Sequence, residues 1–244
     1  MATDIVMDAG TYKTVLYSNG KILLEEPSCV TVDSETWEPI SFGKQAKETF
    51  GRTPESVTTV FPFERGVVSD YDVAEAMIVH FIKSTFGNRI IKPRIIVVVP
   101  SGVTTVQHHS LAQAVSSAGC RNVSTVENTV ALAVGMGLDF TTPHGSMIVD
   151  IGAGTTDIAT LSMGGIVHNE SARVGSVDFD DDIAKYIRRE KNILIGPLTA
   201  EYIKKTVGCA KKRDFDVTVT GKGRDIFSGL PKTFEISSTE ALMQ

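Results

Sequence analysis

Two stretches of the chain repeat one pattern, and this duplication constrains the fold more than any other feature of the sequence. The first stretch, VMDAGTYKTVLYSNG, spans residues 6–20, and the second, VDIGAGTTDIATLSMGG, spans residues 149–165. Each carries Asp-x-Gly between two strand-like runs, with the acids at Asp8 and Asp150. The 142 residues between the two acids far exceed the period of a solenoid repeat, so the sequence predicts two related halves.

Aligning the two acids requires two extra residues, Ala153 and Gly154, in the second copy. The matched pairs are then Gly10 with Gly152, Thr11 with Thr155, Ser18 with Ser162 and Gly20 with Gly164. A glycine bend between strands exposes consecutive backbone N–H groups, which form a nest for phosphate oxygens. An ordinary β-turn explains either hairpin by itself, but the repetition favours two bends that grip one polyphosphate.

The acids of the two bends predict a metal ion. Asp8 and Asp150 would repel a phosphate unless a divalent cation lay between them, so they are expected to hold Mg²⁺ through its retained waters. Lys13 can add positive charge, and hydroxyls can be donated by Thr11, Thr14, Thr155 and Thr156. The chain has no GxxxxGK[ST] motif, and no helix is expected after GAGTTD, which argues against P-loop and dinucleotide sites.

Apolar periodicity predicts the order of the elements. The first half is expected to contain strands at 4–8, 14–18 and 28–33, a helix at 72–87, a strand at 93–102, a helix at about 104–118, a strand at 122–127 and a helix at 128–137. The second half is expected to contain strands at 146–150, 157–162 and 165–174 and a helix at 178–192. The helix at 72–87 should bury Val73, Met77 and Phe81, with His80 packed at the core edge. The irregular stretch that follows the third strand suits a small inserted subdomain.

Composition narrows the class of protein. A net charge of −5 argues against a nucleic-acid partner, which normally requires a basic stripe. The three cysteines are far apart and in no CxxC pairing, which favours unpaired structural thiols in a reducing compartment. No signal peptide is visible, and the longest aliphatic run, IIVVV at 95–99, is too short to span a bilayer. The protein is therefore expected to be cytoplasmic.

These motifs resemble a known superfamily. Duplicated DxGT hairpins, with a strand, an acid and a helix between them, are similar to the phosphate and connecting motifs of actin, Hsp70 and sugar kinases. More narrowly, the chain resembles the MreB family of bacterial actins in EEPSCV, VVVPSGVT, DIGAGTTDIATLSMGGIV, YIRREKNILIGPLTAEYIK and SGLPKTFEIS. The resemblance implies an α/β actin-like ATPase fold, a duplicated ribonuclease H-like fold, with two domains flanking a nucleotide cleft.

The resemblance also implies domain boundaries. Domain I would span 1–145 as subdomain IA, with the small subdomain IB inserted at about 33–68. Domain II would span 146–244, with the start of IIA at 146–178 and IIB at about 179–240. The rest of IIA is expected to be absent from the chain.

Site residues carry over by position. The first phosphate loop would comprise Asp8, Gly10, Thr11, Tyr12 and Lys13, and the second Asp150, Gly152, Gly154, Thr155 and Thr156. In relatives, a pair matching Glu201 and Lys204 reaches the adenosine end of the nucleotide. Without the resemblance, that pair would be a surface i, i+3 ion pair.

One position departs from the family. Relatives carry a Glu that orients the attacking water just ahead of a Pro, whereas this chain reads VENTVALAVG, with Asn128 at that position and Glu127 one residue earlier. An Asn can hold a water but cannot accept its proton, and loss of a general base costs on the order of 10²- to 10⁴-fold in rate. Glu127 and Asn128 are thus the candidate catalytic residues of a slow ATPase.

The family implies further partners. GNRIIKPR places Ile90 and Ile91 where the family has a hydrophobic membrane loop, although both could instead cap the core beneath the next strand. The function expected is a cytoskeletal protein that binds Mg-ATP and polymerises into membrane-associated filaments, which maintain rod cell shape with the cell-wall elongation machinery. It would lie in the cytoplasm, peripheral on the inner face of the membrane. The alternatives are a small-molecule kinase of the superfamily, a non-hydrolysing nucleotide-binding scaffold and an Hsp70-like nucleotide domain.

Overall fold

The computed structural model describes residues 4–51, 54–87, 93–120 and 122–242. Residue contacts divide the chain into two compact units, Met1–Val174 and Gly175–Gln244. The domain boundary expected after residue 145 stays a prediction, and the contacts group the second hairpin with unit 1. Both hairpin bends can therefore be described within one unit.

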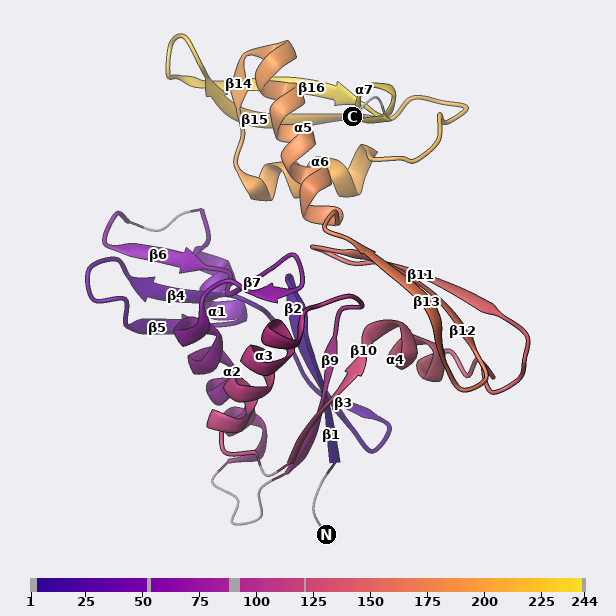
Figure 1. The fold of residues 1–244 in the computed structure, drawn as a ribbon. Coiled ribbons are helices and arrows are strands. Elements are labelled where there is room, and N and C mark those ends of the chain that lie inside the picture. The colour runs from indigo at the N-terminus through magenta and orange to yellow at the C-terminus, as the bar shows by residue number, and fades with distance from the viewer. Residues whose placement is uncertain (1–3, 52–53, 88–92, 121, 243–244) are drawn as a thin grey trace. The chain divides into compact units, whose positions relative to one another are not determined.

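Unit 1 is built on a five-stranded sheet in the order β10-β9-β1-β2-β3 (Figure 1). Its strands are β1 (Asp4–Ala9), β2 (Lys13–Ser18), β3 (Lys21–Pro27), β9 (Arg94–Val99) and β10 (Asn122–Glu127). β1, β2 and β3 form an antiparallel meander, and β9 runs parallel to both β1 and β10. The strand expected at 93–102 is β9, and its apolar IIVVV run suits its interior place between β1 and β10.

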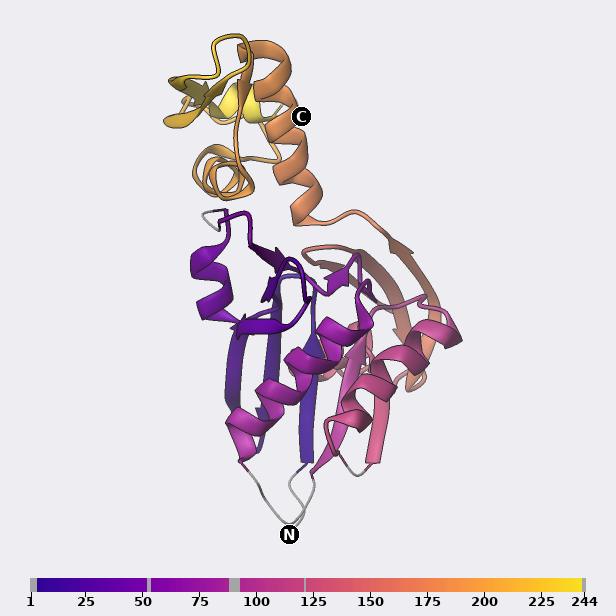
Figure 2. The same ribbon diagram turned by 90° about the vertical axis from the view of Figure 1, so that its left-hand side faces the viewer.

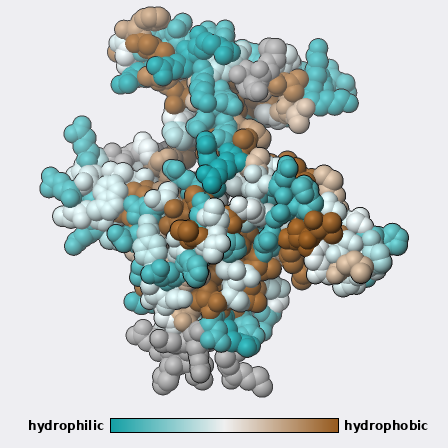
Figure 3. All heavy atoms as spheres, in the orientation of Figure 1, coloured by the Kyte–Doolittle hydropathy of each residue, from teal (hydrophilic) through white to brown (hydrophobic). Residues whose placement is uncertain are grey.

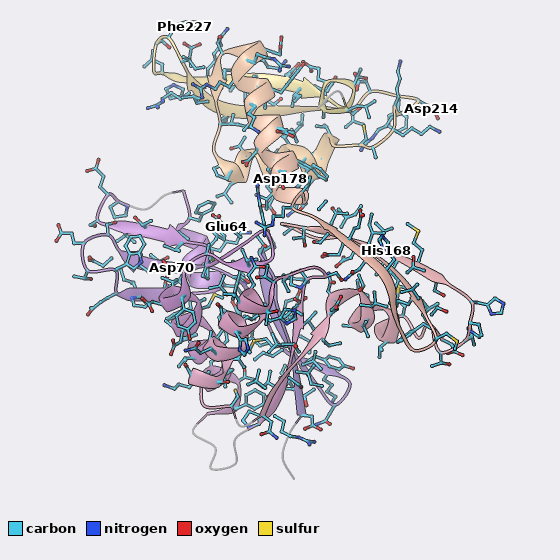
Figure 4. The ribbon with its side chains drawn as sticks, in the orientation of Figure 1. Glu64, Asp70, His168, Asp178, Asp214 and Phe227 are labelled. Carbon is cyan, nitrogen blue, oxygen red and sulfur yellow. The ribbon has the colours of Figure 1, made fainter. Side chains whose placement is uncertain are left out.

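Two helices cover one face of this sheet, as Figure 2 shows: α2 (Tyr71–Phe86) and α3 (Thr105–Ser117). Asp70, labelled in Figure 4, caps α2 by accepting a hydrogen bond from the Val73 N–H at 3.1 Å. The core joins buried helix residues to buried strand residues, among them Val73, Met77, Phe81, Leu111, Ile5, Met7, Leu16, Ile95 and Val97. His80 is exposed and stacks on Phe42 with ring centroids 4.3 Å apart, which places it at the core edge as expected.

The third strand of the first meander is β3, so the strand expected at 28–33 was wrongly placed. β3 pairs with β2, whereas β4 (Val30–Asp33) joins a separate sheet in the order β5-β4-β6. Pro27 ends β3, and the Cys29 N–H bonds the Pro27 carbonyl at 3.0 Å in a tight bend. β3 was missed because it lies at the sheet edge, where its side chains do not alternate between buried and exposed.

A smaller body carries the rest of the predicted insertion. It contains β4, β5 (Pro39–Phe42), α1 (Lys44–Thr49), β6 (Val57–Val60), β7 (Phe63–Glu64) and β8 (Val67–Val68). β7 and β8 form a two-stranded ribbon whose turn has Arg65 at φ 46° and Gly66 at φ 76°. Cys29 is buried beside this body, and burial raises the pKa of its thiol to about 11. All three cysteines are free thiols.

The second hairpin forms a three-stranded antiparallel sheet of β11 (Ser146–Ile151), β12 (Thr156–Ser162) and β13 (Gly165–Ala172). α4 (Asn128–Gly135) follows β10 and packs against one face of this sheet, where a small core contains Ala133, Ile148, Ala159 and Leu161. The opposite face is apolar and exposed, with Met147, Val149, Ile151 and Ile158. Figure 3 shows a patch of apolar side chains on the side of unit 1 where α4 and this sheet lie.

Unit 2 packs two helices against a small sheet. Its elements are α5 (Ser176–Lys191), β14 (Ile193–Leu194), α6 (Pro197–Val207), β15 (Thr218–Asp225), β16 (Pro231–Ser237) and α7 (Ser238–Leu242). The sheet order is β14-β15-β16, and the core joins Ile183 and Ile187 of α5 to Ile203 of α6 and Ile236 of β16. Asn192 ends α5 in the left-handed conformation, with φ 56° and ψ 39°.

Candidate functional site

The two duplicated hairpins close in the same way. In the first, the Gly10 N–H bonds the Lys13 carbonyl at 3.1 Å, and in the second, the Gly152 N–H bonds the Thr155 carbonyl at 2.8 Å. The flanking registers also match, because Ala9 pairs with Thr14 and Ile151 pairs with Thr156. Both bends therefore have the same length, and the two-residue gap placed at Ala153 and Gly154 was wrong.

The two extra residues of the second copy lie in its second strand. β2 ends in a turn at Asn19 and Gly20 with φ 51° and 77°, and β12 ends in a turn at Met163 and Gly164 with φ 53° and 79°. Two positive φ values are typical of type I′ hairpin turns. The buried faces of the two second strands differ: β2 buries Thr14, Leu16 and Ser18, whereas β12 buries Asp157, Ala159 and Leu161, which the register matches to the opposite face.

The two bends approach each other and the β7–β8 turn. A Cβ added to Gly154 would lie 2.6 Å from Oγ1 of Thr11 and 2.9 Å from the N and Cα of Arg65. A Cβ on Gly66 would lie 2.6 Å from Cγ of Pro100 and 3.1 Å from Cγ2 of Thr155. Glu64 marks this turn in Figure 4. The structure thus brings together the bends that the sequence placed 142 residues apart.

The aspartates of the two bends lie within electrostatic reach of each other. Burial of the Asp8 carboxyl and, to a smaller extent, the negative charge of Asp150 raise the pKa of Asp8, while the positive charge of Lys13 lowers it. Burial, followed by the charge of Asp157, raises the pKa of Asp150, while a hydrogen bond from Asn128 lowers it. Asp8 nevertheless stays open to solvent, and Asp150 is partly exposed. Carboxylates that repel one another at an open site are suited to bind a cation.

Asp157 is a third acid at this site, and the sequence reasoning missed it. It pairs directly with Asp150 across β11 and β12, and the residue is fully buried. Its Oδ2 accepts hydrogen bonds from Oγ1 of Thr155 at 3.0 Å and Nδ2 of Asn128 at 2.8 Å. Its Oδ1 has no hydrogen-bond partner among the described residues. The misplaced gap hid this acid by matching it with Lys13, whereas the register matches it with Val15.

Asn128, the first residue of α4, lies at the centre of the polar cluster. Its Nδ2 donates to Oδ2 of Asp150 at 3.1 Å and to Oδ2 of Asp157 at 2.8 Å. Its Oδ1 accepts from Oγ of Ser101 at 3.1 Å and from the Thr129 N–H at 2.8 Å. Ser101 and Thr129 are fully buried and their hydroxyl oxygens lie 3.1 Å apart.

The other candidate catalytic residue, Glu127, has a different surrounding. Its Oε2 accepts a hydrogen bond from Nδ2 of Asn169, on β13, at 3.1 Å. Its neighbour Asn128 is the one bonded to the aspartate of the second bend. Of the two candidates, Asn128 is therefore the one tied to the predicted phosphate loop.

The predicted hydroxyl donors are partly engaged elsewhere. Thr14 is fully buried and its hydroxyl lies 2.9 Å from that of Ser28, so it is enclosed rather than presented to a ligand. Oγ1 of Thr156 donates to the Val174 carbonyl at 2.8 Å, and Oγ1 of Thr11 accepts the Gly66 N–H at 3.4 Å. These contacts anchor each bend to neighbouring segments of unit 1.

Lys13 and Tyr12 of the first bend contact the edge strand β3 and helix α1. Nζ of Lys13 lies 2.6 Å from Oε1 of Glu25 on the edge strand β3. Nζ of Lys47 lies over the ring of Tyr12, 3.7 Å from its centroid. Both residues line an open hollow of about 430 Å³ between β3 and the start of α1.

In unit 2, Glu201 and Lys204 do not form the i, i+3 pair considered from the sequence. Lys204 bonds Oδ2 of Asp180 at 2.8 Å and the Ser176 carbonyl at 2.6 Å, which ties α6 to α5. Glu201 instead pairs with Lys205 at 2.5 Å, one position further along the helix. Their assignment to the adenosine end stays a prediction from family resemblance.

Ile90 and Ile91 lie outside the described residues, so the structure does not bear on the membrane loop. Over the described ranges, no helix has both the length and the apolar character needed to cross a membrane.

Comparison with known proteins identifies clear relatives. A family model described as MreB/Mbl protein matches residues 2–243. The cell shape-determining protein MreB of Escherichia coli (strain K12) is 38% identical over 248 residues, which cover 99% of this chain and 72% of that protein. The cell shape-determining protein Mbl of Bacillus subtilis (strain 168) is 38% identical over 241 residues, which cover 98% of this chain and 72% of that protein.

Solved structures agree with the sequence relatives. The crystal structure of MreB5 of Spiroplasma citri bound to AMPPNP matches with a TM-score of 0.93 at 36% identity, covering all of this chain and 74% of the other. The same protein was also solved bound to ADP, with a TM-score of 0.92. A MamK double helical filament matches with a TM-score of 0.81 at 19% identity, a likeness that shows the fold alone.

Proposed function

Because the chain belongs to the MreB/Mbl family, we propose that it is an actin-like cell shape protein that binds Mg-ATP and assembles into filaments. The family and the structural match confirm the predicted α/β actin-like fold. Two relatives are named as cell shape-determining proteins, and MreB5 was solved with AMPPNP and with ADP. The proposal extends those properties to this chain.

The observation that supports nucleotide binding is the meeting of the two bends. Gly154 lies against Thr11, while the charge of Asp150 raises the pKa of Asp8. Backbone amides from two glycine bends can surround one phosphate chain. Each bend also carries an acid beside its amides. These acids would repel the phosphate chain unless a cation were bound together with it.

The residues present fit a magnesium ion. No group of three or more His, Cys, Asp or Glu side chains in the described part of the chain is placed to hold a metal directly. Mg²⁺ in phosphate sites usually keeps several waters and takes one or two carboxylates plus phosphate oxygens. Asp8 and Asp150 would supply these carboxylates, and the ion would neutralise phosphate charge. By family resemblance, Glu201 and Lys204 would reach the adenosine end of the nucleotide.

Binding and assembly are tested together by two measurements. A fluorescent ATP analogue should bind the purified chain only when Mg²⁺ is present, and Asp150→Asn should weaken that binding at least tenfold. Ser116→Ala, at an exposed position in the last turn of α3, should leave binding unchanged. Ultracentrifugation should pellet the protein with Mg-ATP and leave it in the supernatant without nucleotide. Equal binding with and without Mg²⁺ by wild type and Asp150→Asn would overturn the proposal.

Slow hydrolysis belongs to the same proposal, because Asn128 occupies the position where relatives carry the Glu that orients water. Phosphate release should therefore be slow or absent even when Mg-ATP is bound. Polymers that form without phosphate release would favour the alternative of a non-hydrolysing nucleotide-binding scaffold. ADP formation that depends on an added small-molecule phosphate acceptor would favour the kinase alternative.

Membrane association rests on the sequence alone. We propose that Ile90 and Ile91 insert into anionic membranes and that many loops on one filament add their weak affinities. Replacing both with Ser should abolish pelleting with phosphatidylglycerol vesicles while leaving Mg-ATP binding intact. Unchanged pelleting would contradict the membrane role.

A further inference from the structure

The hydrogen bonds of Asn128 assign this residue a role different from that of the Glu it replaces. A side-chain amide has two N–H donors and one oxygen with two lone pairs. Both donors are used by carboxylates, Asp150 and Asp157, and both lone pairs are used by Ser101 and the Thr129 N–H. With all four positions engaged, the amide has no donor or acceptor left for an attacking water.

The orientation of the amide follows from its neighbours. If the amide were flipped, its oxygen would face the carboxylates of Asp150 and Asp157, and its NH₂ group would face the Thr129 N–H. The first contact is repulsive and the second places donors against a donor. Ser101 adds a further restraint, because its buried hydroxyl links Oδ1 of Asn128 to the hydroxyl of Thr129.

The two carboxylates need such a donor. Asp150 and Asp157 stand opposite each other on neighbouring strands, and Asp157 is fully buried. Like charges directly opposite on neighbouring strands destabilise a sheet. An NH₂ group that bonds one oxygen of each acid offsets this repulsion, whereas a Glu at position 128 would add a third negative charge.

We propose that Asn128 is a positioning residue that clamps Asp150 to Asp157 through its NH₂ group, and that it does not orient the attacking water. Ser101 fixes the amide in this orientation. The clamp exists in the nucleotide-free protein, and only its consequence for Mg-ATP rests on the function proposed above. Restoring the family's Glu at this position would therefore fail to restore hydrolysis.

The first experiment reads the clamp directly in the nucleotide-free protein. In a sample labelled with ¹⁵N-asparagine, the two side-chain amide protons of Asn128 should exchange with water at least tenfold more slowly than those of Asn19, an exposed turn residue. Ser101→Ala should speed the exchange at Asn128 and leave Asn169 unaffected. Equal exchange rates at Asn128 and Asn19 in the wild-type protein would overturn the clamp, and this measurement requires no variant to fold.

The second experiment compares variants of matched geometry. Asn128→Asp keeps the shape of the side chain but turns its two hydrogen bonds to carboxylates into repulsions. Asn169→Asp does the same for one hydrogen bond, the one to Glu127. We expect the nucleotide-free Asn128→Asp protein to melt at least 5 °C below wild type and below Asn169→Asp. A melting temperature for Asn128→Asp equal to that of wild type would refute the clamp.

The third experiment separates the clamp from water orientation. Asn128→Glu should weaken Mg-dependent binding of the fluorescent ATP analogue at least tenfold, with phosphate release no faster than in wild type. A rise in release of about 100-fold with unchanged affinity would show that the position orients water and would refute the inference. If the wild-type protein binds no nucleotide, the proposed function fails, while slow exchange at Asn128 still upholds the clamp.

Discussion

Replacing Gly154 with Ala tests whether the two bends meet as described. The added Cβ would lie 2.9 Å from both N and Cα of Arg65, and these backbone atoms cannot rotate away. Its third contact, Oγ1 of Thr11 at 2.6 Å, accepts the Gly66 N–H, so moving it would also cost a hydrogen bond. Overpacking of this kind costs about 1–3 kcal/mol. The loss of glycine's freedom in the unfolded chain returns about 0.4–1 kcal/mol.

Mid-range values of these two terms give a net loss of about 1–2 kcal/mol in the free energy of unfolding for Gly154→Ala. For a unit of this size, that corresponds to a melting temperature lower by about 2–8 °C. Urea unfolding can be followed by the fluorescence of Trp37, the single tryptophan of the chain, which lies in unit 1.

Gly165→Ala is the matched control for this experiment. Gly165 begins β13 in the same sheet, and a Cβ there would meet no atom within 4 Å. We expect Gly165→Ala to be neutral or slightly stabilising. If Gly154→Ala is as stable as Gly165→Ala, the second bend does not lie against Thr11 and Arg65, and the geometry behind the nucleotide site is wrong.

Two further predictions concern charged side chains. Burial and the charge of Asp150 raise the pKa of Asp8, so ionisation of Asp8 opposes folding as the pH rises above the unfolded-state pKa of about 3.9. Asp8→Asn should therefore raise the melting temperature of the nucleotide-free protein at pH 7.5, give no gain near pH 3.5, and abolish Mg-dependent nucleotide binding. A lower melting temperature at pH 7.5 would contradict the pKa argument. Lys204→Met leaves Asp180, whose Oδ1 already has no partner among the described residues, without its cation and should destabilise unit 2 by about 1–3 kcal/mol. Lys205→Met, the control at an exposed ion pair, should change stability by less than about 1 kcal/mol. Equal urea midpoints for the two variants, followed by circular dichroism, would show that the part-buried Lys204–Asp180 pair contributes nothing.

Local patterns predicted most of the elements. The helix expected at 72–87 is α2 at Tyr71–Phe86, and the strand expected at 122–127 is β10 with the same bounds. The Asp70 cap and apolar periodicity of α2 and the β-branched residues of β10 are local signals, so neighbours in the sequence determine these two elements. β3 gives no such signal, and its place at the sheet edge depends on pairing with β2, which the sequence alone does not display.

The site was predicted in outline only. The repeated acids and glycines are visible because each bend is local, and their approach was inferred from the duplication. The contacts of Asn128 are not visible in the same way, since Ser101 lies 27 residues before it and Asp157 lies 29 residues after it. Asp157 was overlooked for a related reason. Matching identical residue types placed the two-residue gap of the hairpin alignment in the bend, whereas the backbone hydrogen bonds place it in the second strand.

Helix α4 is short and is held at both of its ends by the second sheet. Its first residue bonds Asp150 and Asp157, and its buried Ala133 packs with Ile148 of β11. The helix also continues directly from β10, whose ladder is shared with β9. A rotation of the second sheet would therefore carry α4 with it and displace the end of β10, so this helix of about two turns couples the movements of the two sheets of unit 1.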